Sequence, residues 1–278
     1  MTQRSKKYNS QIEIINSNLV SGQIHYALFD FDGTISLIRE GWQGVMIPMM
    51  VDLLSKTPHP GVVEELPEIV TEYVGRLTGK QTIYQMIKLA EEIEKRGGTT
   101  LDPLVYKSMY HESLMVHTQE RLEKLNTHTV DPSEMMVPGS LEFLQLLAKK
   151  GIVCYLASGT DEIYVLEEAS LLGITKYFKG VYGALDNYKE FSKRMVIQRI
   201  LEENSLRGPE LVAFGDGYVE IEDVKSVGGI AVGVATDEAA RQGVDEWKRS
   251  RLISAGADVI IPDFREYQAL SELLWSTS

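Results

Sequence analysis

Short apolar runs alternate with helical patterns along much of the chain. One run covers residues 24–29, near the N-terminus. Four others, each separated from the next by a helical pattern, lie at 152–157, 211–214, 229–234 and 258–261. Runs of this length that are apolar on both faces are typical of strands buried in a parallel sheet. The pattern therefore predicts an α/β fold whose sheet is built from both ends of the chain.

A long segment interrupts this alternation, because residues 35–136 show helical patterns and no strand signal. Within it, Asp102 followed by Pro103 is typical of the N-cap and first residue of a helix. We therefore expect two domains. One is a sheet domain made of residues 1–34 and 137–278, and the other is a helical domain of residues 35–136 inserted after the first strand.

The composition narrows the class of protein. The chain has 278 residues, of which 44% are hydrophobic, enough for a packed core. Its formal net charge of −12 argues against binding to nucleic acid or to an anionic membrane surface, because phosphate groups attract a basic excess. Cys154 is the only cysteine, so we expect a small buried hydrophobe in a reducing compartment. No signal-peptide-like or membrane-spanning run is evident, and we expect a cytoplasmic protein.

Two carboxylates follow the first predicted strand. Asp30 and Asp32 stand two positions apart, and Gly33 and Thr34 come next. Ligands of open α/β sheets bind beyond the carboxyl ends of the strands, so both carboxylates are candidates for sharing a metal ion there. Gly33 permits a sharp backbone turn at this point. The alternative is a strand that ends in an ordinary polar turn, of which Asp-Gly is a common signal.

Two later strands also end in polar residues. Ser158, Gly159 and Thr160 follow the second predicted strand and precede a helical pattern. A hydroxyl and free backbone amides there favour phosphate binding, or they form an ordinary N-cap. Asp216 follows the third predicted strand between two glycines, where its carboxylate can complete a Mg²⁺ site. The alternative is a solvated acidic helix start, which fits Glu222 well but Asp216 poorly, because Asp216 ends the strand between two glycines.

A site with several carboxylates needs a positive charge if it is also to hold a phosphoryl group. Lys193 stands at the predicted start of a helix, between the second and third of these motifs. Lys189 is close enough in sequence to take the same role. We favour Lys193, because a position at the helix start brings its amine toward the edge of the sheet.

These motifs, in this order, resemble those of the haloacid dehalogenase superfamily of phosphatases and phosphotransferases. The matching residues, in motif order, are Asp30-Phe31-Asp32-Gly33-Thr34, Ser158, Lys193 and Gly215-Asp216. The resemblance implies a Rossmann-like parallel sheet core. It also implies that residues 36–136 are the helical cap found in members similar to phosphoglycolate phosphatase and β-phosphoglucomutase.

The fourth motif departs from the family pattern. Relatives commonly carry an aspartate four residues after the first acid of this motif. This chain has Glu220 at that position and a further acid at Asp223. The outer metal ligand is therefore open between these two residues.

The resemblance implies a Mg²⁺-dependent reaction. Asp30 would attack phosphorus and form an aspartyl-phosphate, and Asp32 would act as acid and then as base. Lys193 would be the third catalytic residue and would hold phosphoryl oxygens. The implied metal-site residues are Asp30, Asp32 through its carbonyl, Asp216 and Glu220. The implied phosphate-binding residues are Ser158 and Gly159, and we count Thr34 of the first motif among the substrate-binding residues. Arg39 is a further candidate, because it lies just after the first motif and can reach over the sheet edge to a leaving group.

We therefore expect a phosphatase that acts on a small phosphorylated metabolite, such as a sugar phosphate or a phosphoglycolate-like ester. A phosphomutase similar to β-phosphoglucomutase would use the same residues and return the phosphoryl group to the substrate. A third hypothesis is a catalytically silent binding protein with the same fold. Dehalogenation is disfavoured, because dehalogenases of this superfamily lack the acid that matches Asp32.

Overall fold

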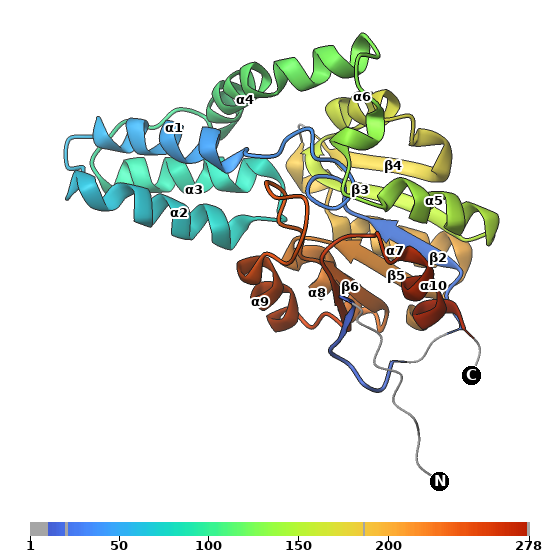
Figure 1. Ribbon diagram of the computed structural model, residues 1–278. Coiled ribbons are helices and arrows are strands. Elements are labelled where there is room, and N and C mark those ends of the chain that lie inside the picture. The colour runs from blue at the N-terminus through green and yellow to red at the C-terminus, as the bar shows by residue number, and fades with distance from the viewer. Residues whose placement is uncertain (1–10, 20–21, 186, 277–278) are drawn as a thin grey trace.

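The sheet contains strands from both ends of the chain, as predicted. The computed structural model describes residues 11–19, 22–185 and 187–276. Within them the strands follow the order β1-β7-β6-β5-β2-β3-β4 across the sheet, and all neighbours are parallel except β1 and β7 (Figure 1). The strands are β1 (Glu13–Ile14), β2 (Tyr26–Phe29), β3 (Val153–Asp161), β4 (Phe178–Ala184), β5 (Leu211–Gly215), β6 (Ile230–Val234) and β7 (Val259–Ile261). The predicted α/β fold with a largely parallel sheet is confirmed.

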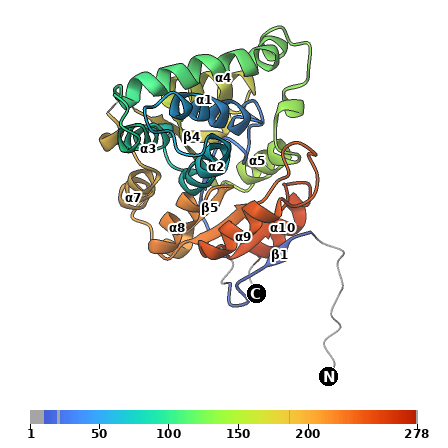
Figure 2. The same cartoon turned by 90° about the vertical axis from the view of Figure 1, so that its left-hand side faces the viewer.

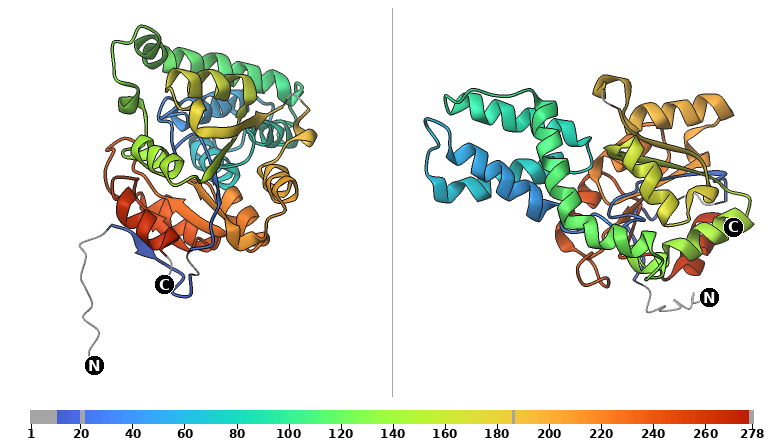
Figure 3. Two further views of the ribbon diagram at one scale, coloured as in Figure 1. Left: turned by 90° about the vertical axis from the view of Figure 1, so that its right-hand side faces the viewer. Right: turned by 90° about the horizontal axis from the view of Figure 1, so that it is seen from above.

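Helices cover both faces of this sheet (Figures 1 and 3). One apolar cluster joins one face to three helices, α5 (Ser140–Lys149), α6 (Glu162–Leu171) and α10 (Tyr267–Trp275). A second cluster joins the opposite face to α7 (Lys193–Asn204), α8 (Tyr218–Ser226) and α9 (Glu246–Ser254). Covering both faces explains why the strand sequences are apolar throughout rather than alternating.

The segment between β2 and α5 forms a separate group of helices, which we call the helical insert. Its members are α1 (Gln43–Ser55), α2 (Leu66–Leu77), α3 (Thr82–Lys95) and α4 (Pro103–Asn126). They pack around an apolar cluster of their own and project from the sheet on one side (Figures 1 and 2). Asp102 caps α4 by accepting a hydrogen bond from the Leu104 N–H, as its sequence predicts.

Two strands were missed by the sequence prediction. β1 is only two residues long and pairs with the edge of β7. β4 contains Lys179, Gly180 and Gly183, which break the apolar run that marks the other strands. It lies at the edge of the sheet and pairs only with β3, so most of its side chains are half-buried.

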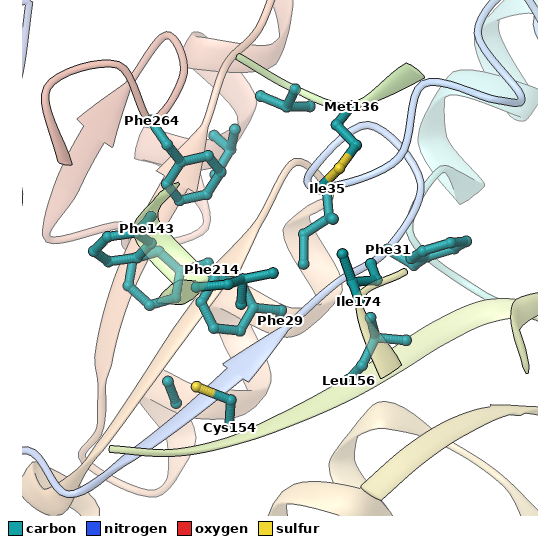
Figure 4. Packing of buried hydrophobic residues seen from close by; sticks show 14 of the residues in the cluster. Phe29, Phe31, Ile35, Met136, Phe143, Cys154, Leu156, Ile174, Phe214 and Phe264 are labelled. Atoms are coloured by element: carbon teal, nitrogen blue, oxygen red, sulfur yellow. The ribbon is translucent and has the colours of Figure 1, made fainter. Parts of the chain in front are cut away.

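Aromatic packing fixes the two central strands that carry the predicted acidic motifs. The rings of Phe29 on β2 and Phe214 on β5 are stacked with their centroids 4.6 Å apart. Phe143 of α5 meets both rings edge-on, and Phe264 closes the group (Figure 4). These residues are essentially fully buried, so the carboxyl ends of β2 and β5 are held side by side by a rigid core.

The cysteine behaves as its sequence context predicts. Cys154 on β3 is 3% exposed, and burial raises the pKa of its thiol to about 12. It is an unreactive part of the core. Across the described residues, no helix combines the length and the apolar character needed to cross a membrane.

Candidate active site

The polar ends of three parallel strands converge on one cavity. The register aligns Phe29 of β2 with Leu156 of β3 and Phe214 of β5, so the residues that follow reach the same edge of the sheet. The cavity at this edge lies between the sheet and the helical insert. Among its lining residues are Asp30, Asp32, Arg39, Ser158, Gly159, Lys193 and Asp216.

Asp30 and Lys193 form the buried centre of the site. The Lys193 ammonium lies 2.9 Å from Asp30 Oδ1 and 2.9 Å from Glu220 Oε2. Burial raises the pKa of Asp30 well above the usual aspartate value, and Glu220 and Asp216 raise it further, whereas Lys193 opposes the rise. Burial alone would lower the pKa of Lys193, but the two carboxylates outweigh that effect and raise it. Lys193 therefore stays charged.

The same carboxylates suit a divalent cation. Asp30, Asp216 and Glu220 each place a carboxylate oxygen within 4.8 Å of the others. Hard oxygen donors at such a spacing match the ligand preference of Mg²⁺. Glu220 belongs to this group and Asp223 does not. Lys189 instead lies over the ring of Tyr188, whereas Lys193 lines the cavity.

Asp32 has a different set of partners. Its Oδ2 accepts a hydrogen bond from Thr160 Oγ1 at 2.8 Å and a longer one from Ser158 Oγ at 3.3 Å. Its buried Oδ1 accepts no hydrogen bond among the described residues, and the Arg39 Nε lies 3.8 Å away. One oxygen of Asp32 is thus held by hydroxyl groups, and the other faces an arginine.

Arg39 is held by a residue that the sequence did not indicate. Its Nε and Nη2 bind Glu168 of α6, with the shortest contact at 2.6 Å, and both side chains are buried. Burial raises the pKa of Glu168 to about 7, although Arg39 opposes the rise. A planar guanidinium that is bound along one edge, through two of its nitrogens, by a carboxylate keeps one orientation. Arg39 therefore presents a rigid positive edge to the cavity.

Gly33 and Thr34 play structural parts in the turn after β2. Gly33 has φ +73°, and a Cβ at this position would lie 2.3 Å from Asp216 Oδ2. Any side chain would therefore displace the carboxylate of Asp216. Thr34 is fully buried, and its side chain is not part of the cavity lining. The structure thus brings Ser158, Gly159 and Arg39 to the cavity but not Thr34, because the turn directs that side chain into the core.

Comparison with known proteins agrees with this geometry. A family model described as haloacid dehalogenase-like hydrolase matches residues 68–235, more than half of the chain. The chain belongs to this family. A search of curated proteins finds no match.

Solved structures share the fold of this haloacid dehalogenase-like hydrolase. A predicted phosphoglycolate phosphatase from Haemophilus somnus is 15% identical, with a TM-score of 0.60 over 90% of this chain and 98% of that chain. A predicted phosphatase from Clostridium acetobutylicum is 18% identical, with a TM-score of 0.59 over 90% and 100%. The β-phosphoglucomutase from Clostridium difficile is 13% identical, with a TM-score of 0.54 over 83% and 98%.

This haloacid dehalogenase-like hydrolase also carries two charged residues that the sequence motifs did not reveal. Lys248 of α9 lies 2.8 Å from Asp216 Oδ2 and 2.5 Å from Glu238 Oε1. Glu238 lines the cavity. Glu238 lies four residues after β6 ends at Val234, so the carboxyl end of that strand could have indicated it. Lys248 lies on α9, where strand-based reasoning has no signal. Thr160, in contrast, stands two positions after Ser158 at the same strand end and could have been proposed as a partner of Asp32.

The loop between α2 and α3, residues 78–81, lines part of the cavity and contacts the edge of the sheet. A Cβ added to Gly159 would lie 2.8 Å from the Lys80 carbonyl oxygen, and one added to Gly79 would lie 3.2 Å from Gly217 Cα. Loop and sheet edge therefore meet backbone to backbone, at positions without side chains. Gln81 strengthens the contact by donating hydrogen bonds to the carbonyl oxygens of Tyr188 and Phe191.

Proposed function

We propose that this protein is a Mg²⁺-dependent phosphatase that hydrolyses a small phosphorylated metabolite through an aspartyl-phosphate on Asp30. The supporting observation is that two aspartates of one turn have separate partners at one cavity. Asp30 binds Lys193, whereas Asp32 binds Ser158 and Thr160. A carboxylate beside a fixed cation is placed for attack on a bound phosphoryl group, and a carboxylate held by hydroxyl groups at the same cavity is placed for proton transfer.

In the first step, Asp30 attacks the phosphorus atom of the ester, and the bond from phosphorus to the leaving oxygen breaks. Asp32, in its protonated form, gives a proton to that oxygen, and an alcohol leaves. In the second step, Asp32 removes a proton from water, which attacks the phosphorus of the aspartyl-phosphate. The products are inorganic phosphate and the free carboxylate of Asp30.

Other residues would hold the phosphoryl group and the ion during both steps. Lys193 carries a fixed positive charge beside Asp30 and would bind phosphoryl oxygens, together with the Ser158 hydroxyl and the Gly159 amide. A bound Mg²⁺, held by Asp30, Asp216 and the Asp32 carbonyl with Glu220 nearby, would offset repulsion between the nucleophile and the phosphoryl group.

The choice of substrate would lie with the helical insert. We assign residues 1–34 and 137–278 to a catalytic core and residues 35–136 to a cap. Residues of this cap line the cavity, among them Trp42, Gln85 and Tyr110. Together with the rigid Arg39, they suit a small polar leaving group such as a sugar or a hydroxy acid. The single cysteine fits a reducing compartment such as the cytoplasm.

The experiment is a screen of phosphate esters with Mg²⁺ present, in which free phosphate and isomerised substrate are both measured. Release of phosphate from sugar phosphates or phosphoglycolate-like esters would support the phosphatase. Isomer formation without free phosphate would contradict it in favour of a phosphomutase. A chain that leaves even a generic phosphate ester uncleaved would be a binding protein with the same fold.

A further inference from the structure

Lys248 contacts two carboxylates of the cavity, those of Asp216 and Glu238, without lining the cavity itself. Its ammonium is shared between Asp216 Oδ2 at 2.8 Å and Glu238 Oε1 at 2.5 Å. Asp216 and Glu238 line the cavity, whereas Lys248 does not, and its side chain is only 11% exposed. Lys248 therefore acts on a bound ligand only through these two carboxylates.

The position of Lys248 is set by its helix. Asp245 caps α9 by accepting hydrogen bonds from the backbone N–H groups of Trp247 and Lys248. Arg249, the residue after Lys248, donates hydrogen bonds from two nitrogens to the carboxylate of Glu13 on β1. A capped and anchored helix start holds the lysine backbone in place, so its ammonium has little freedom to leave the two carboxylates.

The oxygens bound by Lys248 lie at one side of the predicted metal site, to which Asp216 contributes and Glu238 does not. A Cβ on Gly33 would lie 2.3 Å from Asp216 Oδ2 and 3.0 Å from Glu238 Oε1, so both oxygens stand over the turn that carries Asp30 and Asp32. Without the Lys248 ammonium, Asp216 Oδ2 and Glu238 Oε1 would lose this hydrogen-bond donor and could bind a cation in the cavity. Lys248 therefore limits how many carboxylate oxygens a cation can recruit.

The number of available oxygens matters because divalent cations differ in their demands. Ca²⁺ takes six to eight oxygen ligands in flexible geometry, whereas Mg²⁺ keeps several waters and uses one or two carboxylates. We propose that Lys248 is a positioning residue that makes the site select Mg²⁺ over Ca²⁺, by withholding Glu238 and one oxygen of Asp216 from the ion. This inference rests on the metal site of the proposed function.

The test measures the affinities of the protein for Mg²⁺ and Ca²⁺ by calorimetric titration, without substrate. In Lys248→Met, the affinity for Ca²⁺ relative to Mg²⁺ should rise on the order of tenfold, the usual scale for residues that support metal ligands. Lys248→Arg keeps a charged donor and should keep the wild-type ratio. Adding Glu238→Gln to Lys248→Met should remove most of the rise, because Glu238 is the recruited ligand.

Lys56→Met is the control, since it removes one positive charge from an exposed pair with Asp52 on α1 and neither residue lines the cavity, so its ratio of affinities should equal that of the wild type. Thermal unfolding shows that each variant is folded, and Lys248→Gln replaces Lys248→Met if the latter is not. An unchanged ratio in the charge-removing variant, or a rise that persists with Glu238→Gln, would overturn the inference. A wild-type protein that binds neither cation would overturn the metal site itself, and this inference with it.

Discussion

A partly exposed cluster of charges in the helical insert and a buried cluster at the sheet edge use similar side chains with opposite effects on the pKa of a carboxylate. In the insert, Glu92 of α3 lies within 2.9 Å of Lys88, Lys95 and Arg96. Burial favours the protonated carboxyl, but the three cations outweigh it and lower the pKa of Glu92 to about 2. At the sheet edge, the cation that contacts Asp30 among the described residues is Lys193, and burial raises the pKa of Asp30.

The difference lies in the balance of charges. Cations outnumber carboxylates around Glu92, so the ionised carboxylate stabilises the fold. Around Lys193, the carboxylates of Asp30 and Glu220 share a single ammonium, with Asp216 close by. Such an excess of buried negative charge costs stability, and a site of this kind gains from binding a cation. The first cluster is expected to matter for stability and the second for turnover.

The largest expected effect is on turnover. Asp30→Asn should lower the rate of phosphate release by about a thousandfold or more, because an amide cannot serve as the attacking carboxylate. The melting temperature should stay the same or rise, because the substitution removes a buried charge that is poorly balanced. Phosphate release and thermal unfolding measure the two effects.

Asp52→Asn is the control for this substitution, because Asp52 is an exposed aspartate of α1 that pairs with Lys56. It should change neither quantity appreciably. Substantial turnover in Asp30→Asn would contradict the covalent route, and a large loss of stability would contradict the contrast between the clusters.

A smaller effect is expected in the insert. Glu92→Gln should lower the free energy of unfolding by about 1 kcal/mol, since solvent screening limits what a partly exposed cluster contributes. The rate of phosphate release by the folded variant should match that of the wild type. Denaturant unfolding measures the stability. Glu91→Gln removes a neighbouring exposed carboxylate with one partner, Lys88, and should change the free energy by less than about 0.5 kcal/mol.

The smallest effect is the pH dependence of that difference. The pKa of Glu92 is lower in the folded protein than the ordinary glutamate value of 4.5. The stabilisation from its ionised form is therefore complete above about pH 4.5 and is lost as the pH falls toward 2. The free-energy difference between the wild type and Glu92→Gln should shrink over this range. A difference that grows on acidification would show that Glu92 is not held ionised by its three neighbours.

The sequence was informative wherever chemistry follows a strongly patterned element. Asp30 and Asp216 come directly after buried strands, and Lys193 begins a helix with a clear apolar side, so all three could be placed at one edge of the sheet. These positions could be inferred because the buried strands pair in register, which brings the residues after their carboxyl ends to the same edge of the sheet.

The remaining contacts join residues without such local signals. Glu168 meets Arg39 across 129 positions, and Lys248 meets Asp216 across 32. Nothing in the helical patterns of α6 or α9 distinguishes these charged residues from ordinary solvated ones. Their roles depend on which helices the fold places beside the cavity, which is information that the tertiary structure alone contains.

The position of β2 in the middle of the sheet has a consequence for synthesis of the chain. Its neighbours β3 and β5 follow the whole helical insert in sequence, and β5 begins only at Leu211. At about 5 to 20 residues per second, a ribosome needs roughly 10 to 40 seconds between Phe29 and Leu211. During that interval the insert, which has its own apolar cluster, can fold and β3 is made, while β2 still lacks its second neighbour, β5.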